Sequence, residues 1–353
     1  MATMERMGRV FISLQQIKEV PRMLNEAAPS IPGTVRDTEV PHYFRQHFIC
    51  TGYRPINQNW RYYFLSVFHW HNETLNIWTH LLAFLVFLFK LLQLAVVVDF
   101  AGDPHSWPLL VLILSSLIYT AFSTLAHLLA GKSEMCHYTF FFLDYMGVAQ
   151  YQYGCAAVHF YYGMDECLHR HVDGIFMPMA TLLCSISCLG CCYGNYCNHS
   201  RPTWMRNVAQ VMPSAVAYIW DSSPIIARLM SWSTASNDPA ITYHFGQVSF
   251  FLSSAFFFTC PVVERCFPGR CDFMGQSHQL FHVLIACCTL SQIHASYLDY
   301  VGRRELYLRL HRSDGAALIL GLYILTLIIC ALIVAFVLKR VKQTLDLKIN
   351  EPL

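Results

Sequence analysis

The sequence has little charge for its length. Lys, Arg, Asp and Glu make up 13% of its 353 residues, against roughly 25% in soluble domains, so a soluble globular protein of this size is not indicated. Hydrophobic residues account for 55% of the chain and aromatic residues for 14%, a composition that suits lipid-facing surfaces and interfacial belts. The composition therefore indicates an integral membrane protein.

The sequence also lacks the marks of several other classes. Its net charge is +2 and it has no compact basic domain, so we expect no nucleic-acid partner, because phosphate binding needs a concentrated basic face. Its 15 cysteines show no paired spacing and many lie in apolar runs, so we expect most of them to be reduced and buried rather than to form a disulfide scaffold. The first 25 residues lack an uninterrupted apolar run, so we expect no cleaved signal peptide.

Long apolar stretches, by contrast, are abundant. A membrane-spanning helix needs about 20 mostly apolar residues, and seven stretches meet this requirement, namely 75–98, 107–130, 138–162, 174–194, 241–263, 273–298 and 315–338. An eighth stretch, 203–222, is weaker because Arg206 and Asp221 lie near its ends. We predict an all-α, multi-pass membrane bundle of eight transmembrane helices, comprising a seven-helix core and an extra C-terminal helix.

The segments that flank the spans set the expected orientation. With eight spans and a cytosolic N-terminus, seventeen basic residues fall on the cytosolic side and six on the other, so the positive-inside rule places both termini in the cytosol. Residues 1–74 would form a cytosolic region with an amphipathic stretch over 7–24, lying on the membrane or on the protein's own face, and an aromatic belt over 60–64. Residues 75–338 would form the membrane domain and 339–353 a short basic tail.

Four groups of polar residues lie in or beside the predicted spans. Each ionisable group at bilayer depth costs roughly 2.5–3.5 kcal/mol and so needs a partner or a function. The groups are Glu73, Asn76 and His80; Ser123 and His127; Asp144; and His278 and His282. At about 1.5 Å of rise per residue, most of them lie within roughly 10 Å of the cytosolic boundary. Omitting the weak fifth span would invert the seventh and separate its histidines from the others, so this convergence supports eight spans.

Three histidines and a carboxylate in one layer match a common zinc site, in which three protein ligands leave room for a water molecule. We predict that the ligands are His127, His278 and His282. Asp144 would accept a proton from the metal-bound water, and Ser123 would orient a ligand or a bound carbonyl. The alternative is an interhelical hydrogen-bond network without metal. We expect His80 to hydrogen-bond Glu73, Asn76 or a neighbouring helix rather than to bind metal.

These residues lie in motifs that resemble those of the progestin and adipoQ receptor family. Glu73, Asn76 and His80 occur in NETLNIWTHLL, and Asp144 occurs in FFLDYMGVA. STLAHLL and CDFMGQSHQLFH contain the three predicted zinc ligands. The segments TGYRP, YQYG and FPGRCD, together with the eighth span, resemble the membrane progestin receptor branch of the family, of the alpha type.

The resemblance implies zinc bound by the same three histidines, with Asp144 near the metal-bound water, whereas Glu73, Asn76 and His80 match a family motif but not its zinc ligands. The branch implies a plasma-membrane receptor for a progesterone-like steroid, with signalling through an inhibitory G protein and a role in oocyte maturation. Such a receptor predicts an apolar, aromatic-lined cavity. The wider group includes alkaline ceramidases, so the alternative is a zinc-dependent intramembrane hydrolase of ceramide or another lipid amide, with Asp144 as its general base.

Overall fold

The computed structural model describes residues 32–197, 203–232, 237–311 and 315–350. Its contacts divide the chain into one unit over Met1–Thr34 and a second over Val35–Leu353. The fold of the second unit is described here. The predicted amphipathic stretch over 7–24 lies outside the described residues.

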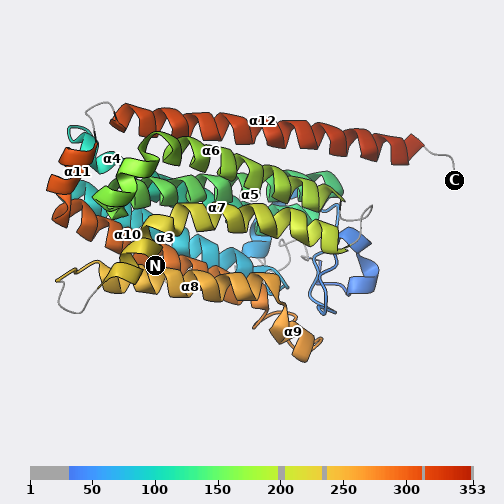
Figure 1. The fold of residues 1–353 in the computed structure, drawn as a ribbon. Coiled ribbons are helices and arrows are strands. Elements are labelled where there is room, and N and C mark those ends of the chain that lie inside the picture. Colours follow the sequence, from blue (N-terminus) through green and yellow to red (C-terminus); the bar gives the residue numbers. More distant parts are fainter. Residues whose placement is uncertain (1–31, 198–202, 233–236, 312–314, 351–353) are drawn as a thin grey trace, which may run out of the picture. The chain divides into compact units, whose positions relative to one another are not determined.

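Long helices make up most of this unit (Figure 1). Within the described residues, eight helices have 19 residues or more: α3 (Thr74–Val97), α4 (Trp107–Leu129), α5 (Glu134–Val158), α6 (Glu166–Tyr196), α7 (Thr203–Ser231), α8 (Ile241–Thr259), α10 (Ser277–Gly302) and α12 (Gly315–Asn350). The shorter helices are α2 (Trp60–Leu65), α9 (Val262–Cys266), α11 (Arg304–Leu310) and the π-helical turn η6 (His159–Gly163). No strand longer than an isolated bridge occurs in the described part of the chain, which confirms the all-α prediction.

Five helical segments are long and apolar enough to cross a membrane by length and composition. They are Thr74–Val97, Pro104–Lys132, Glu166–Tyr196, Ser277–Gly302 and Ala317–Leu347. The remaining three long helices each carry a buried or ionisable polar residue, namely Asp144 on α5, Asp221 on α7 and His244 on α8. The chain is therefore a multi-pass helical membrane protein.

Two helix boundaries differ from the prediction because of local backbone chemistry. Helix α8 ends at Thr259, four residues before the predicted end at 263. Cys260 is extended, with φ −119° and ψ 103°, as expected for a residue before a proline, here Pro261. Helix α10 starts at Ser277 rather than at 273, because Gly275 has φ +89°, a conformation that ends regular helix and favours glycine.

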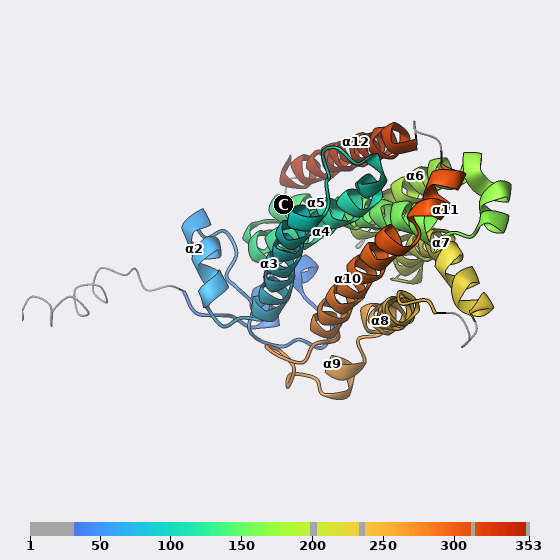
Figure 2. The same cartoon turned by 90° about the vertical axis from the view of Figure 1, so that its left-hand side faces the viewer.

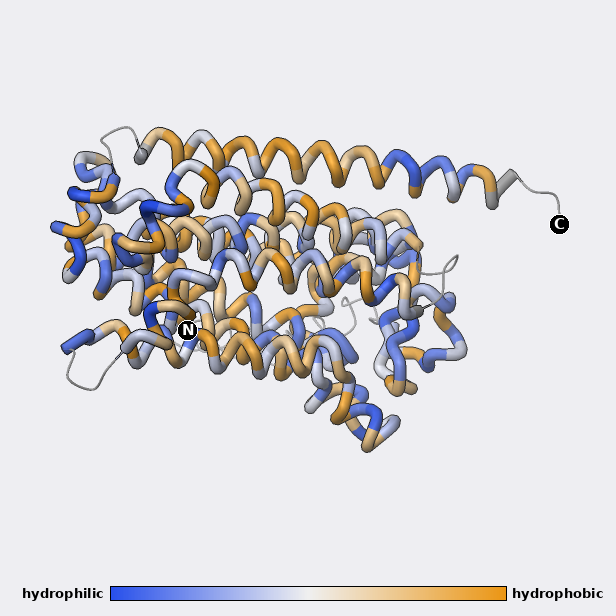
Figure 3. The backbone as a smooth tube through the Cα atoms, in the orientation of Figure 1, coloured by the Kyte–Doolittle hydropathy of each residue, from blue (hydrophilic) through white to orange (hydrophobic). Residues whose placement is uncertain are grey.

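The ends of α6 and α12 extend beyond the predicted spans. Helix α6 begins at Glu166, eight residues before the predicted start at 174. Helix α12 continues to Asn350 through the predicted basic tail, and Figure 3 shows its apolar run giving way to hydrophilic residues toward the C-terminus. The predicted spans are thus the apolar parts of longer helices.

The packing of α4 against its neighbours positions the polar layer. Helix α4 packs between α3 and α5, α8 packs on α10, and α6 packs on α7. Helix α12 lies at the periphery against α5 and α6 (Figure 2). The α4–α5 contact is close: a Cβ atom added at Gly154 would lie 2.2 Å from Ser115 Oγ, and one at Gly147 would lie 2.9 Å from Tyr119 Cα. Glycine at these two positions therefore permits the close approach of the two helices.

The aromatic segment over 60–64 forms α2 and is divided between two environments. Trp60 and Phe64 are exposed, as an interfacial belt requires. Tyr62 and Tyr63 are buried, and the hydroxyl group of Tyr63 donates a hydrogen bond to the carbonyl oxygen of Pro55 at 2.7 Å. The two tyrosines therefore pack inside the protein, because a helical turn directs neighbouring side chains to different faces.

Candidate metal centre

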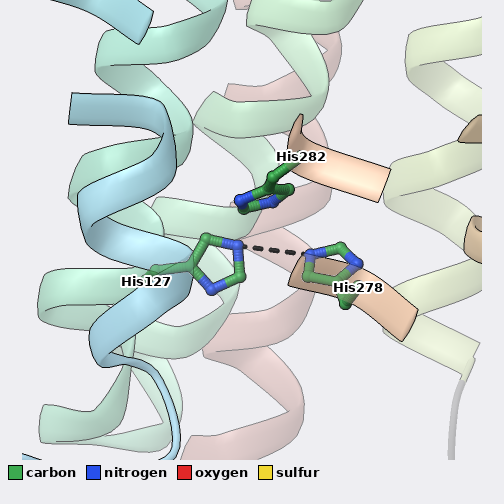
Figure 4. Close-up of side chains that lie close together, drawn as sticks. All are labelled: His127, His278 and His282. Carbon is green, nitrogen blue, oxygen red and sulfur yellow. Dashed lines mark hydrogen bonds between the residues drawn. The ribbon is translucent and has the colours of Figure 1, made fainter. Parts of the chain in front are cut away.

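Three histidines from two helices meet at one end of the bundle. His127 lies in the last turn of α4, and His278 and His282 lie one turn apart at the start of α10. Their ligand atoms all lie within 4.8 Å of one another, and the three rings face a common point (Figure 4). The structure therefore brings together the three residues that the sequence predicts as metal ligands.

The spacing of the imidazole nitrogens suits a single zinc ion. Zinc binds imidazole at about 2.0–2.1 Å in tetrahedral geometry, so two ligand nitrogens on one ion lie about 3.4 Å apart. Nε2 of His127 lies 3.4 Å from Nε2 of His278. His127 and His282 are 4% and 1% exposed, so the centre is shielded from bulk solvent. The residues present therefore fit zinc.

The second ring nitrogens of two of these histidines have partners of their own. Nδ1 of His127 lies 2.7 Å from Oε2 of Glu73. Nδ1 of His282 lies 3.2 Å from the carbonyl oxygen of Asn76 and 3.1 Å from Oγ1 of Thr79. Such partners select the tautomer and orient the ring of a metal-binding histidine. Both histidines are thereby held with Nε2 free to point into the cluster.

Glu73 is the carboxylate that contacts a member of the cluster. It precedes α3, and its Oε2 atom also accepts a hydrogen bond from Nδ2 of Asn76 at 2.7 Å, while its Oε1 atom accepts one from Nε2 of Gln46. The sequence predicts only that Glu73 and Asn76 have a structural role and are not zinc ligands. The structure makes that role specific: Glu73 orients His127 and is itself oriented by two amides.

Asp144 and Ser123 lie near the cluster without joining it. Asp144 projects from α5 within electrostatic range of His127, but its carboxylate is not part of the group of ligand atoms that lie within 4.8 Å of one another. Ser123 is buried on α4, one turn before His127. The roles predicted for these two residues, as a base and as an orienting group, stay predictions.

The hydrogen bond predicted for His80 is wrong. The ring of His80 stacks on that of His282, with centroids 3.6 Å apart and an interplanar angle of 10°. Neither ring nitrogen of His80 has a hydrogen-bond partner among the described residues. The reason is that Glu73 and Asn76 bind each other and the cluster, while the packing of α3 on α10 lays the His80 ring flat against a ligand candidate.

Arg54 is a positioning residue that the sequence analysis missed. Its side chain is buried, and its guanidinium donates hydrogen bonds at 2.6 Å to the carbonyl oxygens of His127 and Leu128, and at 2.8 Å to Oγ of Ser66. The last carbonyl groups of a helix lack intrahelical partners, and a cation satisfies them well. Arg54 therefore fixes the last turn of α4, which carries His127. The only sequence signal for it was its place in the TGYRP segment.

Asp272 performs a related role at the start of α10. Its carboxylate accepts hydrogen bonds from the backbone nitrogens of Cys50 and Thr51, at 3.1 and 2.8 Å, and from Oγ1 of Thr51 at 2.7 Å. Gln276 donates hydrogen bonds to the carbonyl oxygens of Asn72 and Asp272, at 3.1 and 2.8 Å. These contacts tie the segment before α2 to the turn that precedes His278, and the FPGRCD segment was their sequence signal.

A line of buried polar side chains leads from this layer to the opposite end of the bundle. It starts at Tyr119, whose ring contacts His80 edge-on. Consecutive members are joined by hydrogen bonds of 2.8 to 3.4 Å, in the order Tyr119, Thr289, Tyr151, Gln292, His159, Gln247, His244, Asp299 and Arg228. Polar side chains from five long helices and η6 thus satisfy one another inside the bundle, as buried polar groups in a membrane protein must.

A groove lies between α6 and α7. Its volume is about 450 Å³, within the range of roughly 300–1,000 Å³ found for small-molecule sites. Its lining is almost wholly apolar and includes Met164, Phe176, Val216 and Trp220, with Ser223 as a hydroxyl-bearing member. The rings of Phe176 and Trp220 stack with centroids 5.3 Å apart. The groove therefore lies on the bundle's exterior rather than inside it, and Trp220, packed on the buried ring of Phe176, is its partly exposed aromatic side chain.

Comparisons with known proteins agree with these features. A family model described as Haemolysin-III related matches residues 68–293. The chain is 48% identical over 346 residues to the membrane progestin receptor alpha of Cynoscion nebulosus, and 50% identical over 348 residues to the membrane progestin receptor alpha-B of Danio rerio, with 98% of each chain covered in both cases. It is 44% identical over 350 residues to the membrane progestin receptor alpha of Homo sapiens, with 99% of each chain covered. These matches confirm the resemblance noted in the sequence.

Proposed function

The chain belongs to the Haemolysin-III related family, and we propose that it is a membrane receptor for a progestin-type steroid. The observation that carries this proposal is end-to-end similarity: relatives named membrane progestin receptor alpha are 42% to 48% identical over at least 98% of the chain. Similarity of this extent includes every helix and both polar ends of the bundle. A shared ligand class is the simplest consequence.

We further propose that the receptor crosses the plasma membrane eight times, with both termini in the cytosol. Helices α5, α7 and α8 each have 19 residues or more, enough to span about 28 Å at 1.5 Å per residue. Counting all three makes α4 end, and α10 begin, on the same side of the membrane, as the contact between His127 and His278 requires. The distribution of basic residues supports placing that side in the cytosol.

Two native cysteines test this orientation. Cys50 is exposed at the three-histidine end, and Cys167 is exposed in the first turn of α6 at the opposite end. In intact cells a membrane-impermeant maleimide should label Cys167 and not Cys50, and the signal should disappear in the C167S variant. Cys260 and Cys266, which follow α8, are also exposed at the three-histidine end. Labelling of intact cells that survives C167S and is lost only when Cys50, Cys260 and Cys266 are all replaced by serine would reverse the proposed orientation.

We propose that His127, His278 and His282 bind zinc. Bound zinc would supply a Lewis-acid centre and would join α4 to α10. Glu73 would hold His127 through Nδ1, and the carbonyl oxygen of Asn76 would hold His282 through Nδ1, so that both present Nε2. Because a metal that binds only the folded chain stabilises it, the centre would brace the bundle at this end.

The groove between α6 and α7 is our candidate for the steroid site. A flat, apolar ligand would lie against the partly exposed ring of Trp220, and Ser223 would offer a hydroxyl group to a ketone at one end of the steroid. Burial of apolar area would supply most of the affinity, at roughly 25 cal/mol per Å². The steroid would enter sideways from the lipid.

Binding of labelled progesterone to the purified receptor tests both the ligand and the site. Val216→Trp fills the groove and should weaken binding at least tenfold. Ile328→Trp adds the same ring to the exposed face of α12, where Ile328 is 50% exposed against 44% for Val216, and should leave binding unchanged. No saturable binding by the wild-type protein would overturn the receptor proposal, whereas equal binding by both variants would move the site elsewhere.

Signalling through an inhibitory G protein and a role in oocyte maturation are further parts of the proposal, supported by the resemblance to the branch. The measurement is cyclic AMP in cells that express the chain, which progesterone should lower. Receptor names among the relatives do not favour the hydrolase alternative. Purified wild-type protein should therefore release no fatty acid from ceramide above the level of an Asp144→Asn variant, and turnover lost in that variant would restore the alternative.

A further inference from the structure

We propose a second zinc site at the opposite end of the bundle, formed by His169, Asp173 and His311. The two clusters lie at opposite ends of α10, whose 26 residues rise about 39 Å. His169 and Asp173 stand in the first turns of α6, and His311 directly follows α11. Neither the steroid site nor the three-histidine centre uses these residues.

The geometry is that of a metal site with two imidazoles and one carboxylate. One ligand atom from each of the three residues lies within 4.8 Å of the other two. Nε2 of His169 is 3.4 Å from Nδ1 of His311 and 3.4 Å from Oδ1 of Asp173. Both separations equal the edge of a zinc tetrahedron, about 3.4 Å for bonds of 2.0–2.1 Å. A water molecule would complete the four ligands.

The three groups are of the types that bind a cation. Nε2 of His169 carries at most one hydrogen and so can donate to Asp173 or to His311 but not fully to both, while His311 also hydrogen-bonds the backbone of Tyr161. Zinc satisfies all three groups at once, because neutral imidazole nitrogens and a carboxylate oxygen are its ordinary ligands. Arg303, which precedes α11, pairs with Asp165 rather than with Asp173.

The surroundings hold the ligands in place before any metal arrives. Arg303 donates hydrogen bonds at 2.7 Å to the carbonyl oxygens of Tyr162 and Gly163, which ties the start of α11 to η6. Phe160 stacks on His169 with ring centroids 5.2 Å apart, and the ring of Tyr161 lies 4.5 Å from that of His311. A site whose ligands are held by packing loses less entropy on binding.

His169 itself is 4% exposed, whereas the side chain of Asp173 is 65% exposed. The site is therefore buried on one side and open to water on the other. This exposure gives the metal an entry path at the end of the bundle, and it makes Asp173 a position where substitution does not threaten the fold. Leu168 and Val172, which directly precede the two α6 ligands, line the α6–α7 groove. A bound metal would therefore stabilise the part of α6 that forms this end of the groove.

The test is zinc stoichiometry on the full-length purified receptor, dialysed against buffered free zinc and measured by elemental analysis. The wild-type protein should bind two zinc ions, H169A one, H127A one and the double variant none. Asp173→Asn should keep the fold and weaken the second site at least tenfold. The matched control is H171A, which removes an exposed histidine from the same turn of α6 and should retain two ions.

The outcomes separate this site from the three-histidine centre. One zinc ion in the wild-type protein that is lost in H127A and kept in H169A and D173N would overturn the second site alone. One zinc ion that is lost in H169A and kept in H127A would overturn the three-histidine centre and support the second site. A zinc ion lost equally in H171A and H169A would show adventitious surface binding and would also overturn the second site.

Discussion

The two ends of the bundle hold carboxylates in different ways. At the end where α6, α7 and α10–α11 meet, arginines of the chain neutralise them: Arg228 lies 2.8 Å from Asp299, Arg303 lies 2.9 Å from Asp165, and Arg304 lies 2.6 Å from Asp103. Although burial alone raises the pKa of Asp103, hydrogen bonds from Arg304 and Tyr300 hold it below its usual value. Here the chain supplies its own cations.

The three-histidine end also has a buried cation, but this cation does not pair with a carboxylate. Arg54 binds carbonyl oxygens at the end of α4 rather than a carboxylate, and Glu73 is held by His127 and by two neutral amides. No arginine or lysine forms an ion pair with Glu73 in the described part of the chain. The comparison teaches that arginines of the chain pair with carboxylates at one end, whereas at the other end the carboxylate of Glu73 contacts a histidine of the candidate zinc centre.

The largest effect on this contrast is expected when a candidate zinc ligand is removed from the three-histidine end. His278→Ala should abolish zinc binding at the three-histidine centre and lower the midpoint of thermal unfolding, because the metal stabilises only the assembled bundle. Elemental analysis and a melting curve on the same preparation measure both effects. His80→Ala, which removes a stacked but uncoordinated ring, should retain the metal. Unchanged zinc content in H278A would restore the metal-free network.

At the opposite end, removal of the buried arginine should destabilise the protein. Arg228→Ala leaves Asp299 buried without its arginine, since the carboxylate is 2% exposed, and breaking a buried pair in this way costs about 3–5 kcal/mol. Unfolding in detergent should therefore shift strongly while zinc bound at the three-histidine centre stays constant. A change in that zinc content would mean that the two ends are coupled through the buried polar line.

A smaller effect is expected when the partner of a ligand is changed. Glu73→Gln keeps the size of the side chain but removes the negative charge opposite Nδ1 of His127, and loss of such a partner typically weakens metal affinity 10–100-fold. Competition with a zinc-binding dye measures the affinity, and saturating zinc should still fill the site. Glu305→Gln at the exposed, opposite end is the control. Equal affinities for the two variants would mean that Glu73 does not orient His127.

The smallest effect sharpens the contrast between buried and exposed pairs. The side chain of Arg304 is 47% exposed, so its pair with Asp103 should contribute no more than about 1 kcal/mol. Arg304→Ala should therefore barely change thermal unfolding under the conditions that reveal Arg228→Ala. A loss as large as that of R228A would show that the corner between α10 and α11 depends on this exposed pair.

Much of the fold follows from local properties of the sequence. Each predicted span overlaps a long helix, and even the weak stretch over 203–222 lies within α7. The errors fall at ends: Pro261 stops α8 early, and α12 continues as a polar helix beyond its apolar run. The number of apolar residues needed to cross a membrane and the free-energy cost of burying a charged side chain depend on the local sequence, so both can be predicted from it. The position of a helix end depends instead on capping contacts and on the segments outside the apolar core.

The sequence by itself determined that this protein is an α-helical membrane protein with one layer of histidines inside the predicted spans. The reason is that the length of an apolar stretch and the free-energy cost of burying ionisable groups are local quantities. Only the tertiary structure decided which carboxylate touches His127, that His80 stacks instead of donating, and that Arg54 closes α4. It alone brought together His311 and His169, which are 142 positions apart in the sequence. Such contacts depend on how helices rotate and approach one another, and the hydrophobic pattern of a single helix does not specify its partner's rotation.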